Sequence, residues 1–317
     1  MTTPRLTKQL EEGRLVVFSD AVSPFNFTSN AFRHMFSTWD DESEDEWTQH
    51  TLFPALFKKA GYRVDFYSNQ FTMNQDDIWD LAGGTIFNQR GLSDLQFTHR
   101  NSNVYDYDGE LLQQLPSIDS LALSPTLLIV HLKGQHVAYD NKYPEGFAHF
   151  KAEDEKTPFG GELGRQTAAH YDNATYYNDY IVDSIFNMVR HTDAIALYLS
   201  DHGEEVYDWR DKYERTNEGT LYPEVAHYQY EIPLMFYMTD KFQVSHPELA
   251  EAVKGAADQR FYSSDLPHVL LYLAGIHCSE YKEMRNILSP NYHRNRKRIL
   301  RNEVDYDELI KQFHPEE

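Results

Sequence analysis

Two continuous apolar runs constrain the fold of this chain most strongly. Residues 126–132 and 194–200 are apolar at most positions. They do not show the alternation of apolar and polar residues that a strand with one solvent-exposed face would have. Such runs are typical of parallel strands that are buried on both faces of a sheet. Between them, residues 171–190 place Ile181 and Ile185 at helical spacing. The order strand, helix, strand predicts an α/β fold.

Further segments extend this pattern along the chain. Residues 52–60 predict a helix that ends at Gly61, and residues 62–68 then predict a strand. Residues 232–238 predict another strand after the second apolar run. Because no low-complexity linker divides the chain, we expect one domain over residues 1–317. Its sheet should be mostly parallel, with right-handed crossovers, and sandwiched by helices.

Composition and charge narrow the possible partners. The chain has 29 basic and 50 acidic residues, a formal net charge of −21, which argues against nucleic acid as a partner. Its one cysteine, Cys278, rules out an intrachain disulfide and a Cys-rich zinc site. The sequence shows no signal peptide and no membrane-length apolar run, so we expect this chain to be soluble. Residues 290–317 predict a polar tail whose basic cluster is a solvated surface: Arg294, Arg296, Lys297, Arg298 and Arg301.

An acidic residue and a histidine follow the second apolar run directly. Asp201 and His202 stand where a strand ends, and active sites of open α/β sheets gather at the carboxyl ends of strands. A carboxylate beside an imidazole suits Zn²⁺ or Mn²⁺. We expect Gly203 to allow a tight turn that leaves both side chains free to face one ion. The triplet alone would also fit a simple strand cap.

Other histidines occupy comparable positions. His136 lies in the loop beyond the first apolar run, and His227 is expected in a loop before the strand at residues 232–238. Both are candidates for the same site, with an ordinary surface histidine as the alternative reading. His131 ends its strand before the loop turns, so we expect a structural role for it.

If this site transfers phosphoryl groups, it needs a nucleophile in addition to a metal, and Thr28 is the candidate. Its hydroxyl lies at the expected start of a helix over residues 28–37. Backbone N–H groups and the helix dipole at such an end favour an anionic phosphate or an alkoxide. A nearby dication would lower the pKa of the hydroxyl further. The alternative is plain N-capping of the helix by Thr28.

The order of several short motifs resembles the phosphoethanolamine transferases of the alkaline phosphatase and sulfatase superfamily. The resemblance covers nearly the whole chain, and its motifs share the family's order and spacing. They are Thr2-Thr3-Pro4, the stretch 18–24 leading to Thr28 and then Met35-Phe36-Ser37, the H-x-x-G-x-H loop at 131–136, the helix at 171–179, Ser200-Asp201-His202-Gly203-Glu204, and His227 before Glu231-Ile232-Pro233.

The resemblance implies a mechanism and a set of roles. Thr28 would carry a covalent phosphoethanolamine, while Asp201 and His202 would bind one or two zinc ions, with Mn²⁺ as another option. His136 and His227 would bind the phosphate, a second metal or the leaving group, and the supporting positions would be Asn69, Lys133 and Glu204. The donor would be phosphatidylethanolamine and the acceptor a hydroxyl of lipid A, lipopolysaccharide or another glycan. The full-length parent would act at the periplasmic face of the bacterial inner membrane, held there by a segment not present in this chain.

The sequence departs from the family in two respects. The family places its first metal ligand, an acidic residue, at the end of a strand just before the Thr-Thr-Pro motif, and this chain begins after that point. We therefore expect a truncated domain that lacks the first strand and its ligand. Disulfides of the colistin-resistance members are also missing. Two alternatives stay open: a sulfatase or phosphodiesterase-type hydrolase of the same superfamily, and a catalytically inactive domain.

Overall fold

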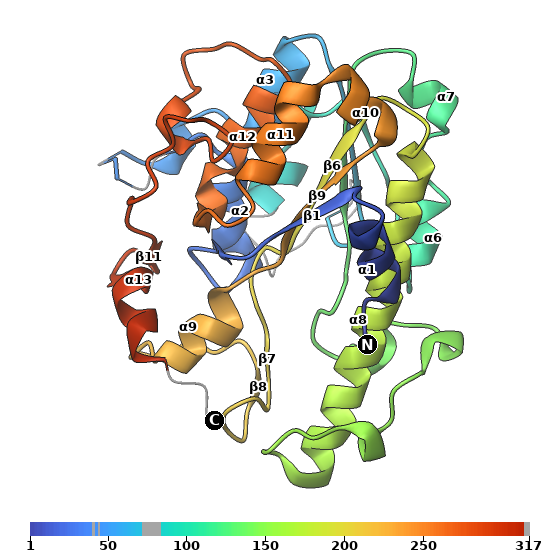
Figure 1. Cartoon of the computed structure of the whole chain (residues 1–317), viewed down its shortest axis with the longest axis vertical. Coiled ribbons are helices and arrows are strands. Elements are labelled where there is room, and N and C mark those ends of the chain that lie inside the picture. The colour runs from blue at the N-terminus through green and yellow to red at the C-terminus, as the bar shows by residue number, and fades with distance from the viewer. Residues whose placement is uncertain (40–41, 44, 72–83, 314–317) are drawn as a thin grey trace.

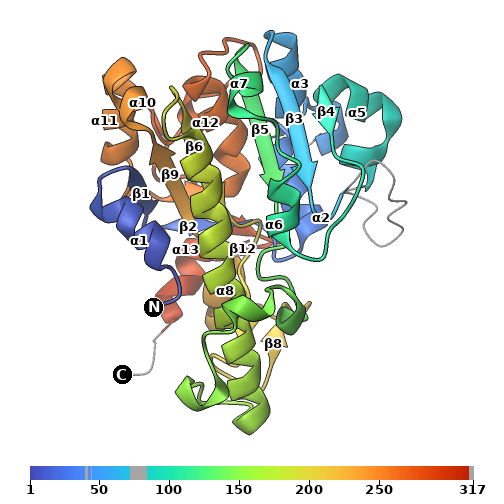
Figure 2. The same cartoon turned by 90° about the vertical axis from the view of Figure 1, so that its right-hand side faces the viewer.

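The protein forms a layered α/β structure. The computed structural model describes four stretches of the chain, residues 1–39, 42–43, 45–71 and 84–313. Two three-stranded sheets form the middle layer, and helices cover both of its faces (Figures 1 and 2). Helix α8 (Gly161–Val189) runs along one face, beside α1 (Pro4–Glu11). The opposite face carries α2 (Thr28–Phe36), α3 (Phe53–Lys59), α11 (Pro247–Gly255) and α12 (Leu266–Leu273). The expected fold class is confirmed.

The first sheet has the order β4-β3-β5 and is parallel throughout. Its central strand β3 (Arg63–Ser68) pairs along its whole length with β5 (Thr126–His131). Strand β4 (His99–Arg100) is a short edge on the other side of β3. The sequence predicted β3 and β5 to within one residue at each end, because both are apolar runs bounded by turns.

The second sheet has the order β1-β9-β6, and its middle strand runs against both neighbours. Strand β9 (Leu234–Met238) is antiparallel to β1 (Leu15–Phe18) and to β6 (Ile195–Leu199). The expectation of a parallel strand over residues 232–238 is therefore wrong at this position. The reason is the path of the chain. Helix α9 (Pro223–Tyr230) lies at the end of the sheet where β6 stops, so the chain enters β9 from that same end.

The helices contribute most of the buried apolar surface. On one face, aromatic side chains of α2 and α3 pack on the strands, and the ring centroids of Phe36 and Phe53 are 5.1 Å apart. On the other face, Phe186 of α8 stacks on Tyr237 of β9 at 4.5 Å. Helix α8 starts ten residues before the predicted 171–190 helix. The prediction missed its first turns because they carry mostly polar residues and show no apolar spacing.

The C-terminal segment is packed against the body of the protein, which corrects the expected solvated surface for two of the five residues in its basic cluster. Arg296 and Arg298 are buried: Arg296 donates to Asp265 at 2.7 Å, and Arg298 to Asp307 at 2.6 Å. Arg294 and Lys297 are exposed, and Arg301 is half-buried. Strands β11 (Ile299–Leu300) and β12 (Val304–Asp305) form a hairpin followed by α13 (Tyr306–Leu309). Carboxylates from other parts of the sequence form ion pairs with these two arginines. A cluster of positive charge in the sequence therefore did not mean that every member is exposed to solvent. Residues 314–317 of the predicted polar tail lie outside the described residues.

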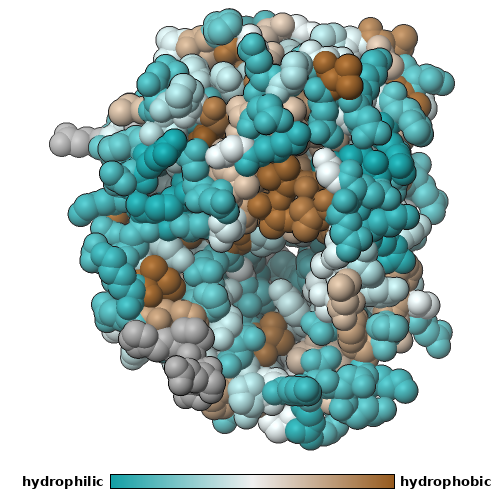
Figure 3. Space-filling view, viewed as in Figure 1, coloured by the Kyte–Doolittle hydropathy of each residue, from teal (hydrophilic) through white to brown (hydrophobic). Residues whose placement is uncertain are grey.

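The remaining elements are short and lie around these layers. They are β2 (Ala21–Val22), α5 (Arg90–Gln96), α6 (Asp108–Leu112), α7 (Ile118–Leu121), β7 (Glu205–Val206), β8 (Tyr213–Glu214), α10 (Asp240–Ser245) and β10 (Phe261–Tyr262). Within the described stretches, no helix combines the length and apolar character needed to cross a bilayer. The face drawn in Figure 3 is mostly hydrophilic, with apolar side chains gathered above a hollow near its middle.

A buried carboxylate attaches the N-terminal helix to α8. The side chain of Asp179 accepts hydrogen bonds from the backbone N–H groups of Arg5 at 3.1 Å and Leu6 at 2.8 Å. It also accepts one from the Arg5 guanidinium at 3.2 Å. Thr3, at the N-cap position of α1, makes no side-chain cap, so Asp179 takes over that function from a different helix.

We predict that Asp179→Ala destabilises the protein by about 3 kcal/mol, because it removes a charged acceptor and leaves buried N–H donors unpaired. Urea unfolding followed by circular dichroism measures this change. The control is Glu162→Ala, which removes an exposed acid on the same helix and should change the free energy of unfolding much less than Asp179→Ala does. Equal effects of the two substitutions would show that Asp179 does not anchor α1.

Candidate active site

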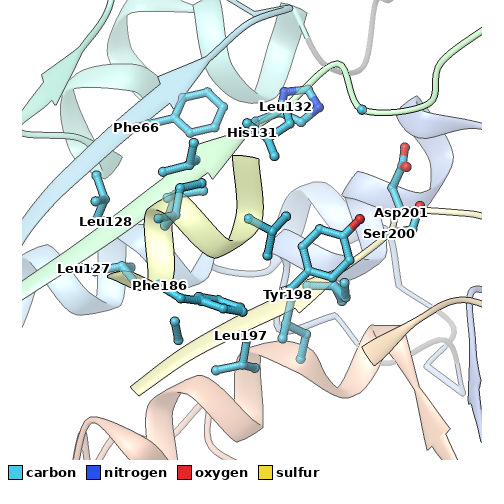
Figure 4. Close-up of a pocket in the computed structure, with 18 of the residues that line it drawn as sticks. Phe66, Leu127, Leu128, His131, Leu132, Phe186, Leu197, Tyr198, Ser200 and Asp201 are labelled. Atoms are coloured by element: carbon cyan, nitrogen blue, oxygen red, sulfur yellow. The ribbon is translucent and has the colours of Figure 1, made fainter. Parts of the chain in front are cut away.

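The candidate residues meet where β5 and β6 end and α2 begins. Thr28, His136, Asp201 and His202 all line a cleft between these elements. Figure 4 shows Asp201 at one end of this cleft, beyond Tyr198 and Ser200. The structure thus brings together four of the residues that the sequence singled out, from segments up to 174 residues apart.

The Thr28 hydroxyl points toward the site and does not cap its own helix. Thr28 is the first residue of α2, and the N-cap residue Phe27 makes no side-chain cap. The partner of Thr28 Oγ1 is the Nε2 atom of His202, at 3.4 Å. Plain N-capping therefore does not account for this threonine. The helix end and the imidazole both face the hydroxyl.

The backbone that carries Asp201 and His202 is held by two short hydrogen bonds. Ser23 Oγ donates to the carbonyl of Asp201 at 2.6 Å, and Ser200 Oγ donates to that of His202 at 2.6 Å. The Nδ1 atom of His202 lies 2.9 Å from the carbonyl of Gly203. This contact assigns the ring proton to Nδ1, because a carbonyl only accepts. Nε2 then presents its lone pair to the cleft.

Two atoms of types that can ligate a metal converge beside the hydroxyl. His202 Nε2 lies 3.4 Å from Asp201 Oδ2, which is buried and has no hydrogen-bond partner among the described residues. Burial raises the pKa of Asp201, but His202 and Thr28 outweigh this effect and hold the pKa below its usual value. Burial lowers the pKa of His202. An anionic carboxylate and a neutral imidazole are the forms that bind Zn²⁺, so this pair fits the metal.

The ligand set supplied by the chain is small. Among the residues that the structure describes, no group of three or more His, Cys, Asp or Glu side chains surrounds a potential metal position. Asp201, His202 and the Thr28 oxygen are the donors at hand. A structural zinc site has four ligands and a catalytic site three plus an open position, so these donors would supply only part of either kind of site.

Gly203 is required by a close backbone contact. Its N–H donates to the carbonyl of Gln229 at 3.0 Å, which packs the turn against the end of α9. A Cβ atom on Gly203 would lie 2.4 Å from the carbonyl oxygen of Tyr228. The φ of Gly203 lies outside the left-handed region, so the turn does not need glycine for its backbone conformation, as the sequence had suggested. Glycine is needed because the backbone of α9 lies too close for a side chain.

An arginine that the sequence did not indicate stands over the site. Arg215 Nη1 lies 3.1 Å from His202 Nε2 and donates to Glu204 Oε2 at 3.1 Å. The other oxygen of Glu204 accepts from the Tyr139 hydroxyl at 2.5 Å. Burial raises the pKa of Glu204 to about 7, against the opposing effect of Arg215. Arg215 follows the β7–β8 hairpin in a polar stretch, where no local pattern distinguishes it from a surface residue.

The two further histidines have different positions. His136 is half-buried in the cleft, and burial together with the charge of Arg215 lowers its pKa. His227 lies on α9, so its expected loop position is wrong. Its Nδ1 atom pairs with Glu231 at 3.0 Å and its ring stacks on Phe313 at 4.4 Å. His227 does not line the cleft.

Asn69 and Lys133, the predicted supporting residues, both donate hydrogen bonds to the buried carboxylate of Asp108. Asp108 Oδ1 accepts from Asn69 Nδ2 at 2.9 Å and from the backbone of Lys133 at 3.0 Å, and its other oxygen accepts from Gly134 N at 2.9 Å. These bonds shape the loop that leads to His136. His131 packs among phenylalanine rings and contacts Ser68 Oγ at 2.9 Å through Nδ1, as its predicted structural role requires.

Comparison with known proteins places this geometry in a family. The model of the family described as Sulfatase matches residues 1–276. The chain belongs to the sulfatase family. Curated relatives include the phosphoethanolamine transferases EptC of Escherichia coli K12, 26% identical over 299 residues, and CptA of Salmonella typhimurium, 29% identical over 302 residues. Each alignment covers 92% of this chain and 50% of the relative, so the chain spans about half the length of these proteins.

Solved structures agree with the fold. The C-terminal periplasmic domain of EcEptC from Escherichia coli superposes with a TM-score of 0.81 at 25% identity, covering 97% of this chain and 86% of that one. The same domain in complex with Zn gives a TM-score of 0.80 at 24% identity, with the same coverage. This member of the sulfatase family therefore shares the fold of the EcEptC periplasmic domain.

We predict that Gly203→Ala destabilises the protein by about 1–3 kcal/mol and weakens zinc binding, because α9 and the turn must separate to admit the methyl group. Urea unfolding and zinc titration by calorimetry measure the two effects. The matched control is Gly219→Ala, because a Cβ atom there meets nothing within 4 Å. Unchanged stability and zinc affinity of Gly203→Ala would contradict the close-contact role.

Proposed function

We propose that this chain is the catalytic domain of a transferase that moves phosphoethanolamine from phosphatidylethanolamine to a hydroxyl group through Thr28. The observation that carries the proposal is the position of the Thr28 hydroxyl. It stands at a helix N-terminus, does not cap that helix, and faces a carboxylate and imidazole pair suited to zinc. The relatives named phosphoethanolamine transferases support this choice of reaction.

Each residue has a role in this proposal. Asp201 and His202 would hold Zn²⁺, which the complex of the related Escherichia coli domain with Zn supports. When bound, the ion supplies positive charge that favours the alkoxide of Thr28 and a developing phosphoryl charge. Thr28 attacks the phosphorus and the lipid alcohol leaves. The acceptor hydroxyl then displaces phosphoethanolamine from Thr28.

Arg215 and His136 would orient the substrate phosphate. The guanidinium of Arg215 carries fixed positive charge beside His202, and Glu204 holds its orientation. Arginine suits this task because its planar donors match phosphate oxygens. The first N–H groups of α2 add further donors on the same side. These groups would stabilise charge on the transferred phosphoryl group.

We propose an acceptor in lipid A, lipopolysaccharide or another glycan. Relatives include a Kdo(2)-lipid A phosphoethanolamine 7''-transferase of Salmonella typhimurium, 27% identical over 296 residues. The related EptC domain is described as periplasmic, which supports action at the periplasmic face of a membrane.

We expect Thr28→Ala to abolish the covalent intermediate. The zinc-loaded protein is incubated with a short-chain phosphatidylethanolamine, and intact-mass spectrometry detects a phosphoethanolamine adduct. The wild type and the control Thr28→Ser, which keeps a hydroxyl, should carry the adduct. An adduct on Thr28→Ala would refute the nucleophile. If phosphoethanolamine is released into water at a rate that added acceptor does not change, the alternative of a hydrolase is favoured. If the wild type binds zinc but forms no adduct, the alternative of a catalytically inactive domain is favoured.

Arg215→Ala should lower kcat/KM by about 10²–10³-fold, because it removes a preorganised donor to the phosphoryl group. Arg215→Lys keeps the charge without the planar donors and should recover part of the loss. Steady-state transfer assays measure both variants. Activity of Arg215→Ala within about twofold of the wild type would exclude Arg215 from phosphate binding.

A further inference from the structure

An exposed aromatic side chain stands directly before the proposed nucleophile. Phe27 occupies the N-cap position of α2, and Thr28 is the first residue of that helix. Phe27 is 37% exposed, and it is the one exposed phenylalanine in the part of the chain that the structure describes. A single exposed apolar side chain is common on protein surfaces, so exposure alone does not indicate a site. The contacts of Phe27 distinguish it.

The first contact joins the ring to the candidate site. The guanidinium carbon of Arg215 lies over the Phe27 ring, 5.9 Å from its centroid. The same guanidinium contacts His202 Nε2 at 3.1 Å, and the Arg215 side chain is only 11% exposed. Cation–π attraction therefore holds the ring against a group that faces the reacting atoms. Phe27 lies at the boundary between the candidate site and the solvent.

The second set of contacts fixes the backbone on both sides of this pair. Asn26 Nδ2 donates to the carbonyl of Thr216 at 3.0 Å and to Gln229 Oε1 at 2.8 Å. Gln229 Oε1 also accepts from the backbone N–H of Thr216 at 3.0 Å. Asn26 and Gln229 are both buried. The residue before Phe27 and the residue after Arg215 are thus joined by a buried network, which is costly to break.

A ring that is exposed but held in this way is suited to binding. An aromatic side chain that is already ordered offers a large, flat contact surface and loses little conformational freedom when a ligand covers it. Burial in the core does not explain the position of Phe27, because its ring faces solvent. The network that holds it instead keeps an apolar surface at a defined place next to Thr28.

The surroundings of the ring indicate which ligand it fits. A lipid surface is contacted through several apolar side chains together. The neighbours of Phe27 are polar: Asn26 and Thr28 in the chain, and Arg215 over the ring. A sugar ring matches this combination, because its hydroxyls suit polar neighbours. Its C–H groups can also pack on the electron-rich face of an aromatic ring.

We propose that Phe27 binds the acceptor of the transfer by stacking on one face of its sugar ring. This inference rests on the proposed function and states which part of the acceptor is recognised. In the second half of that reaction, a hydroxyl oxygen of the sugar bonds to phosphorus and the bond from phosphorus to Thr28 Oγ1 breaks. The hydroxyl proton passes to the Thr28 oxygen. Phe27 sets the position of the sugar and takes no part in these bonds.

The choice between two acceptors tests this role. Zinc-loaded protein that carries the phosphoethanolamine adduct is given either methyl α-D-glucopyranoside or glycerol, and mass spectrometry follows the two transfer products. Both acceptors offer a primary hydroxyl, but only the first has a ring. We expect the wild type to prefer the pyranoside by about 10-fold in kcat/KM, roughly the factor that one aromatic stacking contact supplies. Phe27→Ala should remove this preference, and Phe27→Tyr should keep it.

Tyr180→Ala is the matched control. Tyr180 is 40% exposed and has the Arg5 guanidinium 5.3 Å from its ring centroid, but it does not line the cleft of the candidate site. Tyr180→Ala should therefore keep the preference for the pyranoside. An unchanged preference in Phe27→Ala, or an equal loss in Tyr180→Ala, would overturn the inference. A wild type that forms the adduct but does not favour the ring would refute this inference alone, whereas a wild type without adduct would refute the proposed function.

A binding measurement decides the inference even if no transfer occurs. Aromatic protons of the protein are saturated in an NMR experiment, and transfer of saturation to the ring protons of methyl α-D-glucopyranoside is recorded. A signal in the wild type, Phe27→Tyr and Tyr180→Ala that falls in Phe27→Ala supports the stacking contact. No signal in the wild type, or an equal signal in Phe27→Ala, overturns it. Weaker flotation of Phe27→Ala with phosphatidylcholine vesicles, at an unchanged sugar signal, would assign the ring to a lipid surface instead.

Discussion

The candidate site depends on how the turn after β6 is held. Ser23 Oγ binds the carbonyl of Asp201, and the N–H of Gly203 binds α9. These two contacts fix both sides of His202. Five residues after Ser23, the same segment begins α2 with Thr28. One stretch of chain thus positions the carboxylate and imidazole pair and also carries the hydroxyl that faces it, which leaves their mutual geometry little freedom.

The electrostatics of the site follow from this arrangement. The turn is buried enough to disfavour charge, yet Asp201 stays anionic because its neighbours donate to it or carry positive charge. Arg215 brings a permanent cation close to an imidazole that burial keeps neutral. One cation, Arg215, thus stands beside the imidazole of His202 in a protein whose formal net charge is −21. A guanidinium at this position suits a phosphate group, and the net charge alone would not have indicated it.

The site and the open cleft between the sheets lie at the same place in the fold. At the point where β5 and β6 both end, Asp201 Oδ2 has no hydrogen-bond partner within the part of the chain that the structure describes. The candidate site therefore opens into a cleft with apolar walls.

The sequence by itself determined the main strands and helices, because continuous apolar runs and helical spacing are local properties. It also determined the strand-end position of Asp201 and the helix-start position of Thr28. Only the tertiary structure decided the direction of β9, which follows from the side on which α9 packs. The burial of Arg296 and Arg298 likewise depends on distant carboxylates, and the contribution of Arg215 depends on where a polar hairpin folds back. His227 has the same residue type as His136, but α9 turns it toward Glu231 and Phe313. Contacts between segments far apart in the chain made these distinctions, and a local pattern contains no information about them.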